Sequence, residues 1–250
     1  MTLAPLVLLA LAGAGLLAGF VDAIAGGGGL IALPALLAAG VPPIVALGTN
    51  KMQSVIGTGI AATTYWRRGF VSLKALALGI VAAFAASFAG ALVVEHVDIS
   101  LLQVALPVIL IAVALYFLVA PKLTDADSHA RLSWNVFVPV MGAIVGFWDG
   151  GLGPGTGSFL TVGFVALFGL GVTRAAANTK VLNVASNLGA LALFIASGHV
   201  LWVAALTMAV GQLIGGYLGA LTGIRFGARL IKPLVVVISL ILAAKLLFIH

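Results

Sequence analysis

Long apolar stretches, separated by short polar turns, follow one another along almost the whole chain. They lie at about residues 3 to 25, 28 to 40, 43 to 65, 72 to 94, 99 to 120, 134 to 150, 156 to 170, 174 to 196, 199 to 221 and 230 to 248. A helix needs about 20 apolar residues to cross a bilayer, so the stretches at 28 to 40 and 156 to 170 are too short to cross unaided. We therefore predict an all-α membrane protein with eight full transmembrane helices and short re-entrant or broken half-helices, up to ten segments in all.

The two halves of the chain repeat one another. Gly19 to Asp22 (GFVD) recurs 127 positions later as Gly146 to Asp149 (GFWD), and a glycine-rich run follows each copy. After two inserted residues, Thr49 to Lys51 (TNK) matches Asn178 to Lys180 (NTK). This duplication predicts a first repeat at 1–121, a cytoplasmic linker at 122–133 and a second repeat at 134–250.

Basic residues indicate how the turns are oriented, because loops that carry Lys and Arg stay in the cytoplasm. The turn at Arg67 and Arg68 is basic, whereas its repeat equivalent at 197–199 has no Lys or Arg. Equivalent turns should therefore lie on opposite sides of the membrane, which predicts inverted-topology repeats, an architecture common among secondary transporters. Both termini should lie outside. The pattern leaves open whether segments 1–2 and 6–7 span fully or form re-entrant hairpins.

The composition agrees with a chain that faces lipid. Its residues are 63% hydrophobic and only 7% charged, whereas about a quarter of a soluble domain is charged. The net charge of +6 is scattered over turns and forms no patch for nucleic acid. Cys is absent and the four His are isolated, so we expect no metal and no cofactor. The chain has no nucleophile–base set and no GxSxG elbow, and we expect no enzyme activity.

Four charged residues fall inside apolar segments, away from any turn. They are Asp22 and Lys51 in the first half and their duplicates Asp149 and Lys180 in the second. A charge at the bilayer centre costs about 2.5 to 3.5 kcal/mol and normally faces a protein interior or a watery cavity. These residues could merely tie helices together as ion pairs, but the polar residues around both lysines favour a binding site.

Amides, hydroxyls and glycines accompany the lysines. Polar residues recur at about helical spacing next to each lysine and should line one helix face, whereas a glycine-rich backbone at mid-membrane should line a cavity, with N–H groups that suit an anion. Close helix packing is the other interpretation of the glycine runs, and it is the one we assign to Gly211, Gly215, Gly219, Gly223 and Gly227. We predict an oxyanion site made of Lys51, Lys180, Thr49, Asn50, Gln53, Asn178, Thr179, Asn183, Gly28, Gly29, Gly155 and Thr156, with Ser54, Ser186 and Asn187 nearby.

Asp22 and Asp149 do not suit an anion as ligands. They could instead accept the proton that drives transport, or neutralise the lysines when the site is empty. The residues alone do not decide between these two roles.

Four stretches of the sequence resemble the sulfite exporter TauE/SafE family, also called the toluene-sulfonate uptake permease family, and within it the YfcA-like subgroup. They are GFVDAIAGGGGLIALPALLAAGVPP (19–43), ALGTNKMQS (46–54), GFWDGGLGPGTGSF (146–159) and NTKVLNVASNLG (178–189). The resemblance runs over nearly the whole chain. It implies a permease of the bacterial inner membrane that moves sulfite or organosulfonates and is coupled to the proton gradient. In that membrane, the outside termini expected from the basic turns would be periplasmic.

Two functional hypotheses follow. The first is a secondary transporter that works by alternating access at the interface between the repeats, with a small anion, the lipid bilayer and protons as its partners. The second is a passive anion channel. The identity of the anion, the direction of transport, the coupling ion and a homodimeric assembly stay open at this point.

Overall fold

The computed structural model describes residues 3–98, 100–105, 108, 112, 125–129 and 132–227. In this part of the chain the regular structure is helical, without strands. The helices are α1 (Pro5–Ala25), α2 (Gly29–Ala38), α3 (Pro43–Arg67), α4 (Leu73–Glu95), α6 (Trp134–Gly151), α7 (Thr156–Ala166), α8 (Val172–Ala196) and α9 (Trp202–Phe226). The predicted segment at 230–248 lies outside the described residues, as do most of the segment at 99–120 and much of the linker at 122–133.

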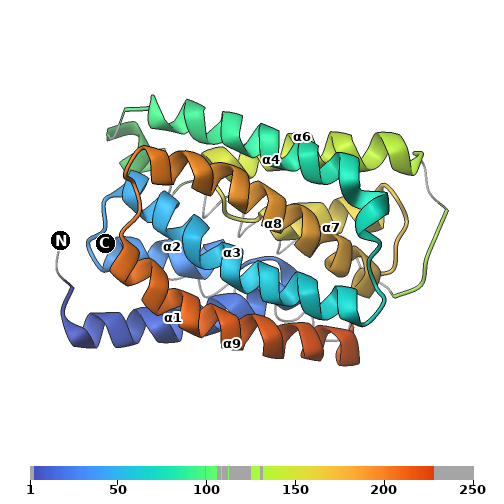
Figure 1. The fold of residues 1–250 in the computed structure, drawn as a ribbon, viewed down its shortest axis with the longest axis horizontal. Helices are drawn as coiled ribbons and strands as arrows, with labels where there is room; N and C mark the ends of the chain where they lie inside the picture. The colour runs from blue at the N-terminus through green and yellow to red at the C-terminus, as the bar shows by residue number, and fades with distance from the viewer. Residues whose placement is uncertain are drawn as a thin grey trace.

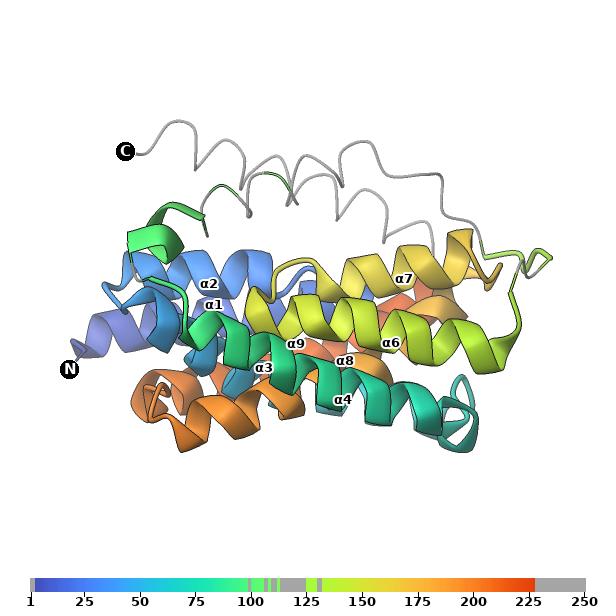
Figure 2. The ribbon, with the colours of Figure 1, turned by 90° about the horizontal axis from the view of Figure 1, so that it is seen from above.

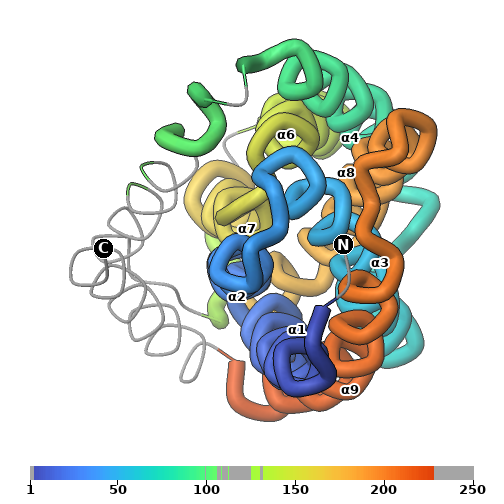
Figure 3. Tube along the Cα trace, turned by 90° about the vertical axis from the view of Figure 1, so that its left-hand side faces the viewer, coloured from blue at the N-terminus to red at the C-terminus, as the bar shows by residue number. Residues whose placement is uncertain are grey.

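The helices form an elongated bundle whose members run roughly along its long axis (Figure 1). Seen end-on, α1 and α9 form one side and α4 and α6 the opposite side, with α3 and α8 between them (Figure 3). Four helices in the described part of the chain are long and apolar enough to cross a membrane, namely α1, α4, α8 and α9. Large apolar side chains such as Leu6, Leu78, Val81 and Val210 are exposed on these helices, as expected of a surface that meets lipid. The fold is that of a multi-pass membrane protein.

The two short helices are half-length, as the sequence predicts. With 10 and 11 residues, α2 and α7 are about 15 and 16 Å long at 1.5 Å per residue, half the thickness of a hydrocarbon core of about 30 Å. Their first turns meet near the middle of the bundle, and from there α2 and α7 run toward opposite ends (Figure 2). A single helix of this length does not cross a bilayer.

Glycine allows the segments around these short helices to touch. Gly26 has a backbone φ of +80°, and α1 ends there. A Cβ built at Gly26 would lie 2.2 Å from the carbonyl carbon of Gly157. Real Cβ atoms do not come this close to backbone, and a side chain at φ +80° would be strained. The glycine-rich runs therefore bring the starts of the two half-helices together.

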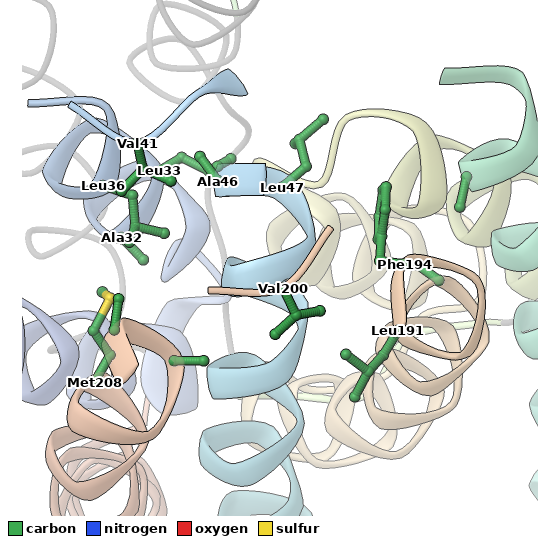
Figure 4. Packing of buried hydrophobic residues seen from close by; sticks show 14 of the residues in the cluster. Ala32, Leu33, Leu36, Val41, Ala46, Leu47, Leu191, Phe194, Val200 and Met208 are labelled. Atoms are coloured by element: carbon green, nitrogen blue, oxygen red, sulfur yellow. The ribbon is translucent and has the colours of Figure 1, made fainter. Parts of the chain in front are cut away.

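An apolar core holds α2 in place. Leu33 and Leu36 of α2 belong to the same buried apolar cluster as Leu47 of α3, Met208 of α9 and Phe194 of α8, and all five are almost fully buried (Figure 4). Because α2 contributes only three turns, these contacts rather than its own hydrogen bonds fix its position. The start of α2, which carries glycine instead of apolar side chains, projects from this core toward the middle of the bundle.

Small residues set the distance between α1 and α9. A Cβ at Gly211, Gly215 or Gly219 would lie 2.2, 2.0 or 2.3 Å from a carbonyl oxygen of α1. The predicted packing role is thus confirmed for these three glycines. Such close backbone approach is typical of small-xxx-small interfaces in membranes.

Replacing Gly215 by Ala should therefore force α1 and α9 apart. We expect the free energy of unfolding to fall by about 2 kcal/mol, the usual cost of overpacking, and the thermal midpoint in detergent to drop with it. Gly59→Ala is the matched control, because a Cβ at Gly59 meets nothing within 4 Å, so its midpoint should stay unchanged or rise. Equal midpoints for the two variants would contradict this account of the interface.

Candidate functional site

The four buried charges form two ion pairs, and each pair joins the two halves of the chain. Lys51 Nζ donates to Asp149 Oδ1 at 2.7 Å, and Lys180 Nζ donates to Asp22 Oδ2 at 2.9 Å. The side chains of both lysines are 1% exposed. Each lysine thus pairs with the aspartate of the other repeat, which repeat equivalence alone did not indicate.

The positions of these residues on their helices bring the pairs to mid-bundle. Lys51 and Lys180 lie eight residues after the first residues of α3 and α8, which is about 12 Å along each helix. Asp22 lies near the end of α1 and Asp149 near the end of α6, just before the chain turns into the half-helices. All four charges therefore lie where the first turns of α2 and α7 meet.

The two carboxylates have different partners. Asp149 accepts hydrogen bonds from Lys51, from Thr156 Oγ1 at 2.8 Å and from Ser186 Oγ at 2.6 Å. Asp22 accepts from Lys180 and from the backbone N–H of Gly28, at 3.2 Å. A buried charge is tolerated only with such partners, because its desolvation otherwise costs several kcal/mol.

A small polar cavity lies between the pairs. Its volume is about 20 Å³, which holds about one water molecule. The lining combines both aspartates, the glycine-rich starts of α2 and α7, and polar side chains of α3 and α8: Asp22, Gly26, Gly29, Asn50, Ser54, Thr58, Asp149, Gly153, Gly155, Thr156, Gly157, Asn183 and Asn187. The N-termini of two helices are attractive to an anion, but an anion with several heavy atoms fits only if side chains move.

Seven of the residues predicted from the sequence line this cavity: Asp22, Gly29, Asn50, Asp149, Gly155, Thr156 and Asn183. Lys51, Lys180 and Gly28 lie next to it through their hydrogen bonds to the lining aspartates. Their role as ligands or coupling groups stays a prediction.

Four predicted ligands make other contacts. Thr49 Oγ1 accepts the backbone N–H of Leu201 just before α9, and Asn178 donates to the carbonyl of Arg174 one turn earlier. Gln53 bonds Asn50, and Thr179 accepts from Thr161 Oγ1 at 3.2 Å. Thr49 and Thr179 thus join their helices to neighbouring segments, whereas Asn178 and Gln53 bond within their own helices, and Gln53 holds the lining residue Asn50.

The structure adds lining residues that the predicted set lacks. Ser54 and Asn187 had been noted only as neighbours of the lysines, and Thr58 had not been singled out. The signal for Thr58 is in the sequence, because Asn50, Ser54 and Thr58 recur every fourth residue, as do Asn183 and Asn187 on α8. Gly26, Gly153 and Gly157 belong to the glycine runs.

Metal binding finds no support in the described residues, where no group of three or more His, Cys, Asp and Glu side chains comes together. The lining combines two carboxylates, several amides and hydroxyls, and the starts of two helices. The two lysine ammonium groups lie next to it, each bonded to a lining aspartate.

The chain is similar to known membrane transporters over nearly its whole length. The family model of the sulfite exporter TauE/SafE matches residues 11–246. The chain is 47% identical over 235 residues to "Probable membrane transporter protein ORF9" of Sinorhizobium sp, covering 94% of this chain and 90% of that one. It is 44% identical over 245 residues to "Probable membrane transporter protein YfcA" of Escherichia coli strain K12, covering 98% and 91%. A "Probable membrane transporter protein" of Haemophilus influenzae is 41% identical over 234 residues, covering 94% and 92%. No solved structure matches the chain significantly.

The crossed pairing predicts which double substitution restores stability. Lys51→Met leaves the Asp149 carboxylate buried without its ammonium partner, and we expect a loss of about 3 to 5 kcal/mol in the free energy of unfolding. Adding Asp149→Asn should recover most of that loss in denaturant unfolding of the purified protein. Adding Asp22→Asn instead should deepen it. Recovery with Asp22→Asn would show that the pairs form within each half.

Proposed function

The chain belongs to the sulfite exporter TauE/SafE family of membrane transporters, and from this premise we propose that it is a proton-coupled secondary transporter of small sulfur-containing oxyanions such as sulfite or organosulfonates. The observation that supports this proposal best is the meeting of two lysines and two half-helix starts at one buried cavity. The family supports a sulfur-containing substrate, and the cavity with its neighbouring lysines supports an anionic one.

An anion can take the place of a carboxylate at either lysine. The ammonium of Lys51 or Lys180 now bonds an aspartate oxygen, and an oxyanion offers the same acceptor with the same sign of charge. Neighbouring amides such as Asn50 and Asn183 would donate to its remaining oxygens. An ammonium freed without a replacement would be an uncompensated buried charge, so binding and release of the aspartate should occur together.

Charge balance gives a reason for proton coupling. The two lysines and two aspartates together carry no net charge, so a bound monovalent anion makes the site negative by one. A proton on one aspartate restores neutrality, which matters because a net charge inside the membrane costs several kcal/mol. We therefore propose that each negative charge of the substrate moves together with one proton, whichever way the gradient drives transport.

The helix contacts support inverted repeats and alternating access. At the repeat offsets of 127 and 129 residues, α1 corresponds to α6 and α9 to α4. Gly15 packs on Met208 between α1 and α9, and the equivalent Gly142 packs on Gly79 between α6 and α4. The cavity lies where the two halves meet, so rocking of one half against the other would open it to alternate sides.

Basic residues support the proposed orientation. Arg67 and Arg68 are exposed at the end of α3, which lies at the end of the bundle opposite the start of α1 (Figure 1). Arg174 lies near the start of α8, at the same end as Arg67. By the rule that basic loops stay inside, we propose that this end faces the cytoplasm and that the start of α1 faces the periplasm of a bacterium.

Transport of radiolabelled sulfite into proteoliposomes tests the proposal. Flux should rise when a pH gradient is imposed and should fall at least tenfold in Lys51→Ala and Lys180→Ala, because each variant removes an ammonium from the site. Lys74→Ala is the matched control, since Lys74 is exposed near the start of α4 and should leave the flux unchanged. Circular dichroism and gel filtration establish that the variants are folded.

A channel would behave differently in the same vesicles. It would carry an ohmic current that is indifferent to the pH gradient, and that result would replace the carrier by a passive pore. Absence of any flux with sulfite, an organosulfonate and sulfoacetate would contradict the proposed substrate class.

A further inference from the structure

Asp22 and Asp149 occupy equivalent positions in the two repeats but differ in their hydrogen bonds. In addition to Lys51, Asp149 accepts the hydroxyl of Ser186 and shares the hydroxyl of Thr156 with the carbonyl oxygen of Gly153. Asp22 has one backbone N–H, that of Gly28, in addition to Lys180. The side chain of Asp22 is also more exposed, at 11% against 3% for Asp149.

The sequences of the two repeats explain this difference in hydroxyl donors. At the offset of 127 residues, Thr156 corresponds to Gly29, and at the offset of 129 residues, Ser186 corresponds to Gly57. The first repeat therefore has glycine at both positions from which the second repeat donates a hydroxyl to its aspartate. Each repeat therefore contributes one lysine and one aspartate, but only the second repeat contributes hydroxyl donors at these two positions.

Hydrogen bonds to a carboxylate favour its ionised form, and loss of such bonds makes protonation easier. Asp149 has Ser186 and Thr156 as hydroxyl partners in addition to Lys51. Asp22 lacks both hydroxyls, and its side chain is the more exposed of the two carboxylates that line the cavity.

We propose that Asp22 is the carboxyl that binds and releases the coupling proton, whereas Asp149 stays ionised as the fixed counter-ion of Lys51. This inference rests on the proposed proton-coupled function. A proton delivered by water forms an O–H bond on Asp22, and the hydrogen bond from Lys180 breaks. Lys180 keeps its own protons and its positive charge, which then faces the cavity. Lys180 is thus the lysine that receives the anion.

The other groups around Asp22 are compatible with this role. Lys180 of α8 is its direct partner, and Tyr65 of α3 lies nearby, with its hydroxyl donating to the carbonyl of Ala23 at 3.2 Å. Across the cavity lies the Lys51–Asp149 pair, which is neutral as a whole. From α7, Thr156 adds a hydroxyl, which bonds Asp149.

Infrared difference spectroscopy of the purified protein in lipid vesicles tests this without any transport measurement. The chain has six Asp and Glu residues in all, so two variants are enough to assign a band. Lowering the pH should increase the intensity of the C=O stretching band of a protonated carboxylic acid that is shielded from water. That band should be absent in Asp22→Asn and present in Asp149→Asn.

The variants Asp22→Asn and Asp149→Asn could misfold, so two further variants that keep both aspartates test the same assignment. Gly29→Thr gives the first repeat the hydroxyl of the second, and its Cβ would make an ordinary contact with Pro154 at 3.4 Å. It should lower the pH midpoint of the band by about one unit, a tenfold change in proton affinity. Ser186→Ala should instead make Asp149 easier to protonate and add a second titrating carboxyl.

Loss of the band in Asp149→Asn, with retention in Asp22→Asn, would overturn the assignment, as would equal titration of both aspartates. The proposed function fails separately, because sulfite flux in vesicles can be absent while the infrared assignment holds. Conversely, flux driven by a pH gradient with the band assigned to Asp149 would keep the function and reject this inference.

Discussion

Four charges buried at the middle of an apolar bundle are the constraint on which the rest of this structure depends. Each of them would cost several kcal/mol alone, and in the described part of the chain each is paired with a residue of the other half, Lys51 with Asp149 and Lys180 with Asp22. Each half carries one lysine and one aspartate, but neither lysine pairs with the aspartate of its own half. If the halves move apart at this site, an ion pair must break or be replaced. The proposed carrier function requires such a link between movement and the binding of an ion.

The half-helices and their glycines follow from the same requirement. In the function we propose, an anion that replaces a carboxylate would need donors in a region without bulk water, and the N-termini of α2 and α7 would supply them from the backbone. Both helices must start at mid-bundle, so the chain has to reverse there at close range. Gly26 and Gly157 make this possible, since a Cβ at either position would lie within 2.6 Å of the other segment's backbone. Apolar contacts of Leu33 and Leu36 then hold α2 against the bundle.

Sequence reasoning located the elements and the charged residues but not the way they face one another. The stretch at 43–65 becomes α3 (Pro43–Arg67), and the short stretch at 156–170 becomes α7 (Thr156–Ala166), because hydrophobic length and glycine position are local properties. The crossed pairing of the charges depends on how α3 and α8 pack. The alignment of one repeat with the other gives no information on that packing. Thr49 and Asn178 were predicted as ligands from proximity to the lysines, yet they bond backbone elsewhere. Thr58 was passed over because periodicity along α3, rather than distance from Lys51, indicates which residues share a face.

Anomalous diffraction from crystals grown with selenite, the selenium analogue of sulfite, tests the central claim most directly. The account predicts one strong selenium peak between the starts of α2 and α7, within hydrogen-bond distance of a lysine ammonium and with an aspartate displaced from that lysine. A selenium peak only at the protein surface, or in a cavity that neither Lys51 nor Lys180 reaches, would contradict it.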